Sequence, residues 1–206
     1  YQILIKILEE NPGNIIKNIK QKMEEACAEL AGLYSLFRFP DLSIKYYLLA
    51  IDNSLDNSSI IRYALMANES YTLLGQYKEG LSFLLKIYNK IGFHNEETAS
   101  IAHAISLIFS RQKKIKDEFY WQLKAHASGF QGNSEAIERL FEKATTTLFI
   151  AKKFQPALDF YLAALKVYKE IPAGKQIIYK NGIVHIITRC FYYAGECEKN
   201  LNNLSN

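Results

Sequence analysis

The stretch LGQYKEGLSFLLKIY at residues 74–88 has a counterpart, AKKFQPALDFYLAAL, at residues 151–165. In both, an aromatic residue stands three places before a small residue, and a large residue follows the small one after four places. Tyr77, Gly80 and Leu84 hold these places in the first stretch. Since spacings of three and four put residues on one helical face, each stretch is predicted to be a helix whose small residue lies against a neighbouring backbone. An element that recurs in this way is typical of a stacking unit.

The small residue serves as a landmark for aligning further units. The landmarks are Ser43, Gly80 and Ala157. Four places after each landmark comes a large residue: Tyr47, Leu84 and Tyr161. Three places further comes an apolar residue: Ala50, Ile87 and Ala164. Nine places before each landmark, a first helix is expected to end, at Tyr34, Tyr71 and Leu148. One more unit fits between Gly80 and Ala157, with Asp117, Trp121 and Lys124 in register after Ile108.

This pattern resembles the tetratricopeptide repeat (TPR), a helix-turn-helix of about 34 residues. The match is fullest at 64–88 and 141–165, partial at 27–50, and covers most of residues 24–170. The resemblance implies an all-α fold, a right-handed superhelix (solenoid) of antiparallel helix pairs with a concave face. Ser43 and Gly80 are 37 residues apart, a longer step than the family's, as in divergent bacterial regulators built from such repeats.

One solenoid fragment is expected to occupy residues 1–206. Residues 1–12 would end a truncated repeat, 13–170 would hold about four repeats, and 174–206 would form a terminal helix and polar tail. The helices are expected at 2–10, 13–37, 41–53, 58–74, 78–91, 96–110, 115–128, 134–152, 155–169 and 174–194. Asn11 can cap a helix that starts with Pro12, and Gly195 is expected to end the last helix before a frayed tail from Asn200.

The composition favours a folded chain with no direct nucleic-acid contact and no membrane span in this segment. An apolar content of 49% in 206 residues can bury a large core, and the net charge of +4 is a mild excess. The longest basic run, residues 111–116, has no aromatic residues between its charges for base stacking. No apolar run approaches the roughly 20 residues that span a bilayer, so no membrane span is expected in this segment.

The sequence offers little for catalysis or metal binding. Cys27, Cys190 and Cys197 cannot all pair and form no C-x-x-C unit, so buried, reduced thiols and a cytoplasmic location are expected. The four histidines, His94, His103, His126 and His185, show no H-E-x-x-H spacing. No glycine-rich phosphate loop or G-x-S-x-G elbow is present. We therefore expect no enzyme activity, catalytic residue, metal or cofactor, although a triad assembled from distant residues stays open.

Two aromatic runs, at residues 119–121 and 191–193, are open to two interpretations. Core packing is favoured over a ligand cage, because large rings fill space between repeats. Consecutive residues on a helix point in different directions, so one member of each run must lie near the surface. Tyr120 and Tyr193 stay open as partner anchors.

In TPR folds the first helix of each pair lines the concave groove, and the resemblance implies candidate groove residues here. They are Glu25, Glu29, Arg62, Met66, Glu69, His103, Glu142, Lys143, Thr146, His185 and Arg189. Chaperone-binding members of the family clamp a carboxylate with lysine, asparagine and arginine. The matching places here hold Ala28, Gly32, Met66 and His103, so a chaperone-tail receptor is not expected.

The leading hypothesis is therefore a non-enzymatic module that binds a protein or peptide in this groove. The long repeats and the Lys-, Asn- and Ile-rich composition resemble the recognition parts of bacterial signalling or transcriptional regulators. The alternative is a structural scaffold or self-association segment without a separate ligand, in which another copy of the chain fills the groove, so that a homo-oligomer is possible.

Overall fold

The computed structural model describes residues 12–92, 96–130, 134–170 and 183–204. Every regular element within these ranges is helical, as the three-and-four periodicity predicts. The chain divides into two compact units, residues 1–91 and 92–206. The single solenoid fragment stays a prediction.

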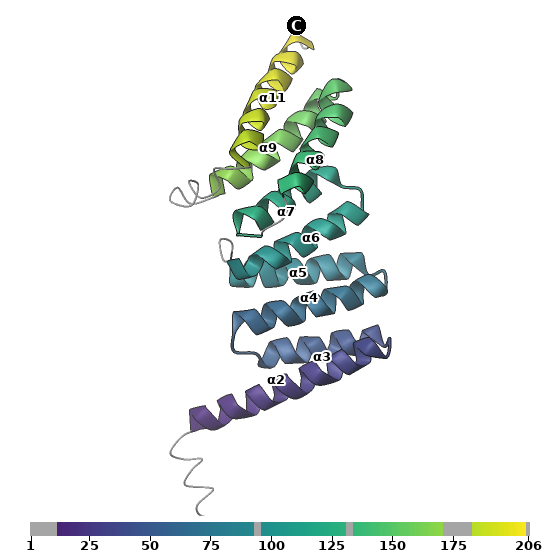
Figure 1. The fold of residues 1–206 in the computed structure, drawn as a ribbon, viewed down its shortest axis with the longest axis vertical. Coiled ribbons are helices and arrows are strands. Elements are labelled where there is room, and N and C mark those ends of the chain that lie inside the picture. The colour runs from purple at the N-terminus through teal and green to yellow at the C-terminus, as the bar shows by residue number, and fades with distance from the viewer. Residues whose placement is uncertain (1–11, 93–95, 131–133, 171–182, 205–206) are drawn as a thin grey trace, which may run out of the picture. The chain divides into compact units, whose positions relative to one another are not determined.

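The described residues of unit 1 form four helices (Figure 1): α2 (Pro12–Leu36), α3 (Pro40–Asn53), α4 (Asn57–Leu73) and α5 (Tyr77–Ile91). Each helix packs on the next in sequence, and the short turns make neighbours antiparallel. The Asp56 side chain caps α4 by accepting a hydrogen bond of 2.8 Å from the Ser59 backbone N–H. The interior includes Ile44, Tyr47, Ala50, Ile60, Ala64, Ala67, Leu84 and Ile87.

Unit 2 begins with a short 3₁₀ turn, η1 (Glu96–Thr98), and continues as α6 (Ala99–Arg111), α7 (Ile115–Ala127), α8 (Ser134–Ala144), η2 (Thr145–Ile150), α9 (Phe154–Glu170) and α11 (Ile183–Leu204). Helix α6 packs on α7, α7 contacts α8 and α9, and α9 packs on α11. Its core is aromatic-rich, with fully buried Phe119, Phe141, Phe160 and Tyr161.

Four turns, each between the first and second helix of one predicted repeat, share one backbone geometry, and its hydrogen-bond pattern recurs after α7 at Gly129. At their centres Arg38, Gly75, Lys113 and Lys152 adopt left-handed conformations with φ of 62°, 70°, 57° and 59°. In each turn the next residue donates its N–H to the carbonyl five places back, as Gln76 does to Tyr71 at 2.9 Å. This pattern is the Schellman motif, which satisfies the last carbonyls of a helix. The four turns therefore align the units independently of side-chain type.

This alignment corrects the predicted register of the third repeat, which consists of α6 and α7. The N–H groups of Ser43, Gly80 and Ala157 each donate to the carbonyl four places back, and in the third repeat Glu118, not Asp117, makes this bond to Lys114. The places taken by Trp121, Lys124 and Ile108 in the prediction therefore belong to Gln122, Ala125 and Phe109. Ala125 is fully buried, like its counterparts Ala50 and Ala164.

The predicted helix 134–152 changes geometry near its end. Residues 145–150 form a π-helix, and the hydroxyls of Thr146 and Thr147 donate to the carbonyls four places back at 2.9 and 2.8 Å. Threonines that bond in this way disturb regular α-helical geometry. A π-turn takes up more residues than an α-turn, consistent with the longest landmark step, from Glu118 to Ala157.

The predicted end of the last helix is wrong. Helix α11 continues through Gly195 to Leu204, and the tail from Asn200 is helical as far as Leu204. The reason is packing, because Ala194 and Cys197 are buried in the unit 2 core and Leu201 lies against it. The predicted helix 2–10 and the start of the predicted helix 174–194 lie outside the described residues.

Candidate partner-binding surface

In unit 1 three predicted groove residues lie together on α4. Arg62, Met66 and Glu69 follow one another at spacings of four and three, so they share one helical face. All three are exposed, with 42% of Met66 accessible to solvent. This face therefore presents a cation, an apolar group and an anion in a row.

The Arg62 side chain is held in place by its neighbour Tyr63. Its Nη2 donates a hydrogen bond of 2.9 Å to the Tyr63 hydroxyl, and its guanidinium lies 4.8 Å from the centre of the Tyr63 ring. The Tyr63 hydroxyl in turn donates to Glu24 Oε1 on α2, at 3.2 Å. Burial raises the pKa of Tyr63, while the hydrogen bond from Arg62 opposes the rise. A chain of polar contacts thus joins α2 to α4 beneath the exposed face.

Tyr47 of α3 lies against this chain. Its ring is buried and stacks on Tyr63 with the ring centres 6.3 Å apart. Burial raises the pKa of Tyr47, the negative charge of Glu69 raises it further, and the positive charge of Arg62 lowers it. Both charged residues of the exposed face therefore act on one buried hydroxyl. Tyr47, Tyr63 and Glu24 thus form a connected set of buried side chains next to the charged residues of α4.

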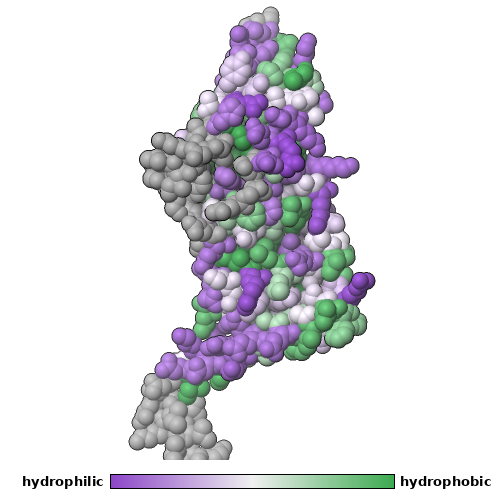
Figure 2. Space-filling view, viewed as in Figure 1, coloured by the Kyte–Doolittle hydropathy of each residue, from purple (hydrophilic) through white to green (hydrophobic). Residues whose placement is uncertain are grey.

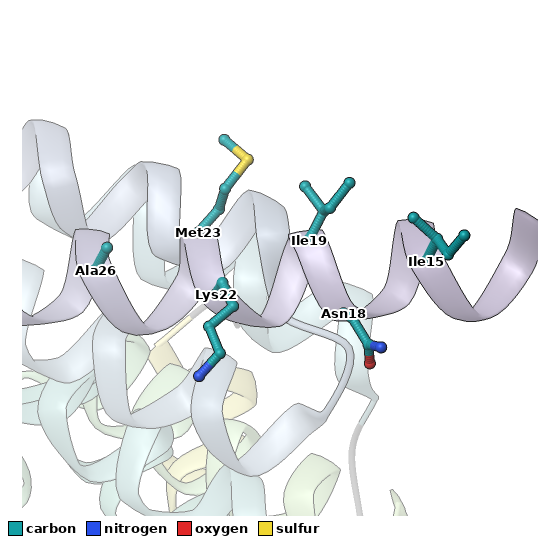
Figure 3. Close-up of a pocket in the computed structure, with 6 residues that line it drawn as sticks. All are labelled: Ile15, Asn18, Ile19, Lys22, Met23 and Ala26. Carbon is teal, nitrogen blue, oxygen red and sulfur yellow. The ribbon is translucent and has the colours of Figure 1, made fainter. Parts of the chain in front are cut away.

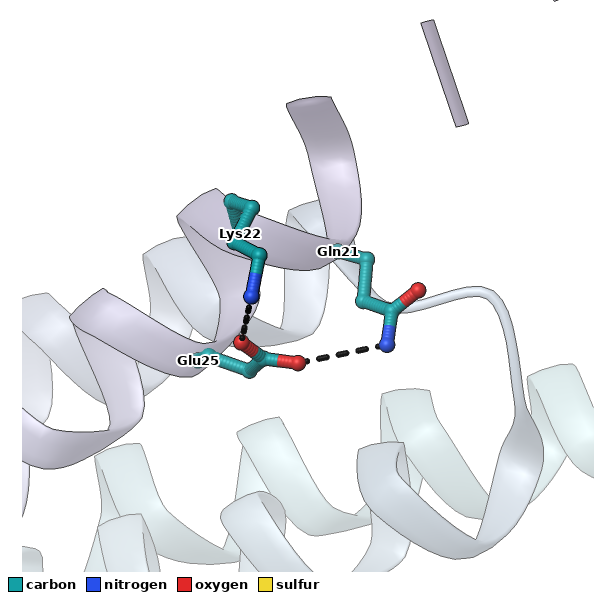
Figure 4. A network of polar contacts seen from close by, with 3 residues as sticks. All are labelled: Gln21, Lys22 and Glu25. Atoms are coloured by element: carbon teal, nitrogen blue, oxygen red, sulfur yellow. Dashed lines mark hydrogen bonds and ion pairs between the residues drawn. The ribbon is translucent and has the colours of Figure 1, made fainter. Parts of the chain in front are cut away.

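The candidates on α2, Glu25 and Glu29, are both exposed. Glu25 accepts hydrogen bonds from Lys22 Nζ at 3.1 Å and Gln21 Nε2 at 3.2 Å, both on its own helix (Figure 4). The bond from Lys22 lowers the pKa of Glu25. Glu24, which sequence reasoning missed, is the acid that reaches α4. One signal was available, since Glu24, Ala28 and Ala31 share a helical face at spacings of four and three.

In unit 2 the predicted groove residue His103 packs against an aromatic side chain. It is half-buried, and its ring stacks on Phe130 with centres 4.3 Å apart. Burial lowers the pKa of His103, and a hydrogen bond with Gln122 opposes the shift. The predicted exposure of this residue in a groove is therefore only partial.

The remaining candidates of unit 2 differ in their surroundings. Glu142, Lys143, Thr146 and His185 are exposed. Arg189 is half-buried, with its guanidinium 4.5 Å from the centre of the Phe141 ring. A cation over an aromatic face at this distance stabilises both groups. Arg189 therefore contributes to the packing of α11 on α8 as well as to the surface.

The first aromatic run packs as predicted, whereas the second exposes two of its three residues instead of one. Phe119 and Trp121 are buried and Tyr120 is half-buried. In the second run Phe191 and Tyr192 are exposed, while Tyr193 stacks on Tyr161 at 5.5 Å between ring centres. Core packing thus accounts for Tyr193.

The thiols do not form a reactive site. Cys190 and Cys197 are buried, as predicted, and burial raises their pKa values to about 12 and about 11. Cys27 is half-buried. In the part of the chain that the structure describes, no three His, Cys, Asp or Glu side chains are grouped so that they could hold a metal ion.

No described helix combines the length and apolar character needed to cross a membrane. The chain matches no protein-family model, no curated protein and no solved structure.

Proposed function

We propose that the chain is a non-enzymatic recognition module of the TPR type that binds a peptide or a segment of another protein on its first helices. The observation that carries the proposal is the face of α4, where Arg62, Met66 and Glu69 stand exposed above the buried Tyr47 and Tyr63. Arg62 is restrained by Tyr63, so little freedom is lost when a ligand carboxylate binds it.

The spacing of the charges indicates the ligand. Arg62 and Glu69 are seven residues apart, which is about 10 Å along a helix at 1.5 Å per residue. An extended peptide covers this distance in about three residues. The complementary ligand is therefore an extended segment with an acidic residue, an apolar residue and a basic residue, the two charges about three places apart.

By resemblance, the proposal includes the right-handed superhelix of TPR proteins and a role as the recognition part of a bacterial signalling or transcriptional regulator in the cytoplasm. The remaining predicted groove residues, from Glu25 to Arg189, belong to the same hypothesis. The scaffold alternative is favoured by a different observation, an apolar face of α2, which is developed in the next subsection.

A display selection with random dodecapeptides on the 206-residue chain tests the proposal. We expect the selected peptides to carry the acid–apolar–base pattern and to bind the Arg62→Ala/Glu69→Ala variant at least tenfold more weakly, about 1.4 kcal/mol. The reciprocal variant Arg62→Glu/Glu69→Arg should prefer peptides of reversed charge order. Lys86→Ala and Lys166→Ala, on second helices, are matched controls and should bind normally. Peptides that bind wild type and Arg62→Ala/Glu69→Ala equally would refute this site.

A further inference from the structure

Helix α2 carries an apolar stripe whose positions are spaced alternately by three and four residues. The stripe consists of Ile16, Ile19, Met23, Ala26, Leu30, Leu33 and Phe37, the last residue lying just past the helix. All seven are exposed, among them Ile16 at 56%, Ile19 at 54% and Leu33 at 51%. Alternating three-and-four spacing over three heptads is typical of a helix that pairs with another helix along its length.

Figure 3 shows the N-terminal part of α2, where Ile19 and Met23 of the stripe project to the same side of the helix as the half-buried Ile15, which is not part of the stripe. With Asn18, Lys22 and Ala26 they line a shallow hollow on the helix surface. Hydrophobic surface also gathers at the turn from α2 to α3 (Figure 2), the region of the exposed Leu36, Phe37 and Phe39. Contiguous exposed apolar surface of this kind marks an interaction site.

The repeat itself shows what this face does elsewhere. When α2 and α4 are aligned by the turns at Arg38 and Gly75 that follow them, four stripe residues have equivalents in α4. Met23, Ala26, Leu30 and Leu33 correspond to Ile60, Tyr63, Ala67 and Ser70. These four residues of α4 are buried. Tyr63 stacks on Tyr47, and Ser70 donates a hydrogen bond of 3.1 Å to Ser43, both on the preceding helix α3. On α4 the face is therefore covered by a neighbouring helix.

The stripe is longer than this packing requires. Helix α4 begins at Asn57, which corresponds to Lys20 of α2, so Ile16 and Ile19 lie on turns that α4 lacks. Helix α2 has 25 residues and α4 has 17. A neighbour that took only the place of α3 would leave Ile16 and Ile19 unused. The full stripe instead fits a partner helix as long as α2.

We infer that α2 pairs antiparallel with α2 of a second copy of the chain. With the two-fold axis between Glu24 and Glu25, Ile16 meets Leu33 of the second copy, Ile19 meets Leu30, and the large Met23 meets the small Ala26. In heptad terms Lys22 and Glu29 both flank the stripe at g positions, which face each other in antiparallel pairs. This register brings Lys22 of each copy near Glu29 of the other. A shift by one heptad would instead place the two Glu29 carboxylates together.

The size and charges of the surface are consistent with this occupant. Seven side chains, most of them about half exposed, offer several hundred Å² per copy, near the roughly 800 Å² per partner of a standard interface. Lys22 is at present paired with Glu25 at 3.1 Å, and its side chain is 81% exposed. An exposed pair of this kind is weak, so the ammonium can turn to Glu29 of the second copy. The pairing does not depend on peptide binding by α4.

Sedimentation velocity under reducing conditions, from about 1 to 100 μM protein, tests the pairing. We expect a concentration-dependent dimer whose Kd rises at least tenfold with Ile19→Glu or Ala26→Glu. Leu73→Glu, at a side chain of α4 that is 69% exposed, is the matched control and should leave the Kd unchanged. Circular dichroism spectra should be the same for all variants, since none of the three side chains is buried.

Charge reversal tests the register separately. Lys22→Glu should weaken the dimer, and Lys22→Glu/Glu29→Lys should restore it, because the two ion pairs re-form with exchanged signs. A monomer at every concentration, or a dimer indifferent to Ile19→Glu and Ala26→Glu, would overturn the inference. Failure of the double variant to recover from the single one would overturn the antiparallel register.

Discussion

Helices α4 and α5 approach each other closely at Gly80, and Gly80→Ala probes this contact directly. A Cβ at this position would lie 3.0 Å from Asn68 Oδ1 and 3.2 Å from Tyr71 Cβ. Both neighbours belong to α4, and Asn68 Oδ1 is buried without a hydrogen-bond partner among the described residues. The added methyl group therefore meets two atoms that are already enclosed.

Gly32 on α2 is the matched control in the same unit. A Cβ at Gly32 would have the Tyr47 hydroxyl 4.0 Å away as its one close neighbour, which is an ordinary contact. Alanine is more favourable than glycine by about 1 kcal/mol inside a helix, so Gly32→Ala should stabilise unit 1 by about that amount. At Gly80 the same gain is offset by overpacking, which typically costs about 1–3 kcal/mol. The two variants should therefore differ by at least about 1 kcal/mol.

Urea unfolding followed by circular dichroism at 222 nm measures both variants, because they affect the same unit. Gly80→Leu should be worse than Gly80→Ala, with a loss of about 3 kcal/mol or more. The reasoning would be refuted if Gly80→Ala stabilised as much as Gly32→Ala while Gly80→Leu unfolded at the wild-type urea concentration.

Two further predictions concern the turns and the histidines. Lys113 adopts the left-handed conformation that Gly75 holds in the equivalent turn. Lys113→Gly should therefore raise the free energy of unfolding by up to about 1 kcal/mol, and Gly75→Lys should lower it by a similar amount. Urea midpoints measure both changes, and a lower midpoint for Lys113→Gly would contradict the prediction. Burial lowers the pKa of His103 and of His126, so the unfolded chain takes up protons first as the pH falls through about 6.5. Stability from these neutral histidines is therefore present above that pH and lost below it, with a slope of at most about 1.4 kcal/mol per pH unit for each histidine. His126→Gln should reduce the difference in unfolding free energy between pH 7.5 and pH 5, and an unchanged difference would show that burial of His126 has no effect on stability.

The helical fold and most helix boundaries could be predicted because glycine, aromatic and apolar residues recur at helical spacing. In the third repeat, α6 and α7, this pattern was not enough to predict the register. In the third repeat Glu118 takes the place of the small residue, and Gln122 takes the place of the large residue four positions later. Neither residue type indicates its role, so side-chain pattern alone put the landmark one residue too early. Backbone hydrogen bonds were needed to find Glu118.

The candidate surface was predictable only in part. The spacing of Arg62, Met66 and Glu69 places them on one face, and the repeat register indicates that the face is open. The support beneath them could not be predicted, because it depends on three helices meeting. The hydrogen bond from Tyr63 to Glu24 spans 39 residues of sequence. The helical face that Glu24 shares with Ala28 and Ala31 indicates that Glu24 is buried, but it does not indicate which residue Glu24 contacts.

The stripe on α2 has a further consequence for the repeat architecture. A first helix inside an array needs two apolar faces, one for its own partner and one for the preceding helix. Helix α4 uses both, with Asn68 and Tyr71 against Gly80 of α5 and with Tyr63 and Ser70 against α3. Helix α2 has the first face, with Ala31 buried, and keeps the second face apolar although it is exposed.

A helix face that stays in contact with water is normally polar, because exposed apolar surface lowers solubility. Helix α2 instead exposes Ile19, Met23 and Leu33 on this face. This exposed apolar face supports the proposed pairing of α2, and the reciprocal charges of Lys22 and Glu29 favour a partner with the same sequence. The double charge reversal discriminates most strongly, because a different partner helix would have no reason to recover when Glu29→Lys is added to Lys22→Glu.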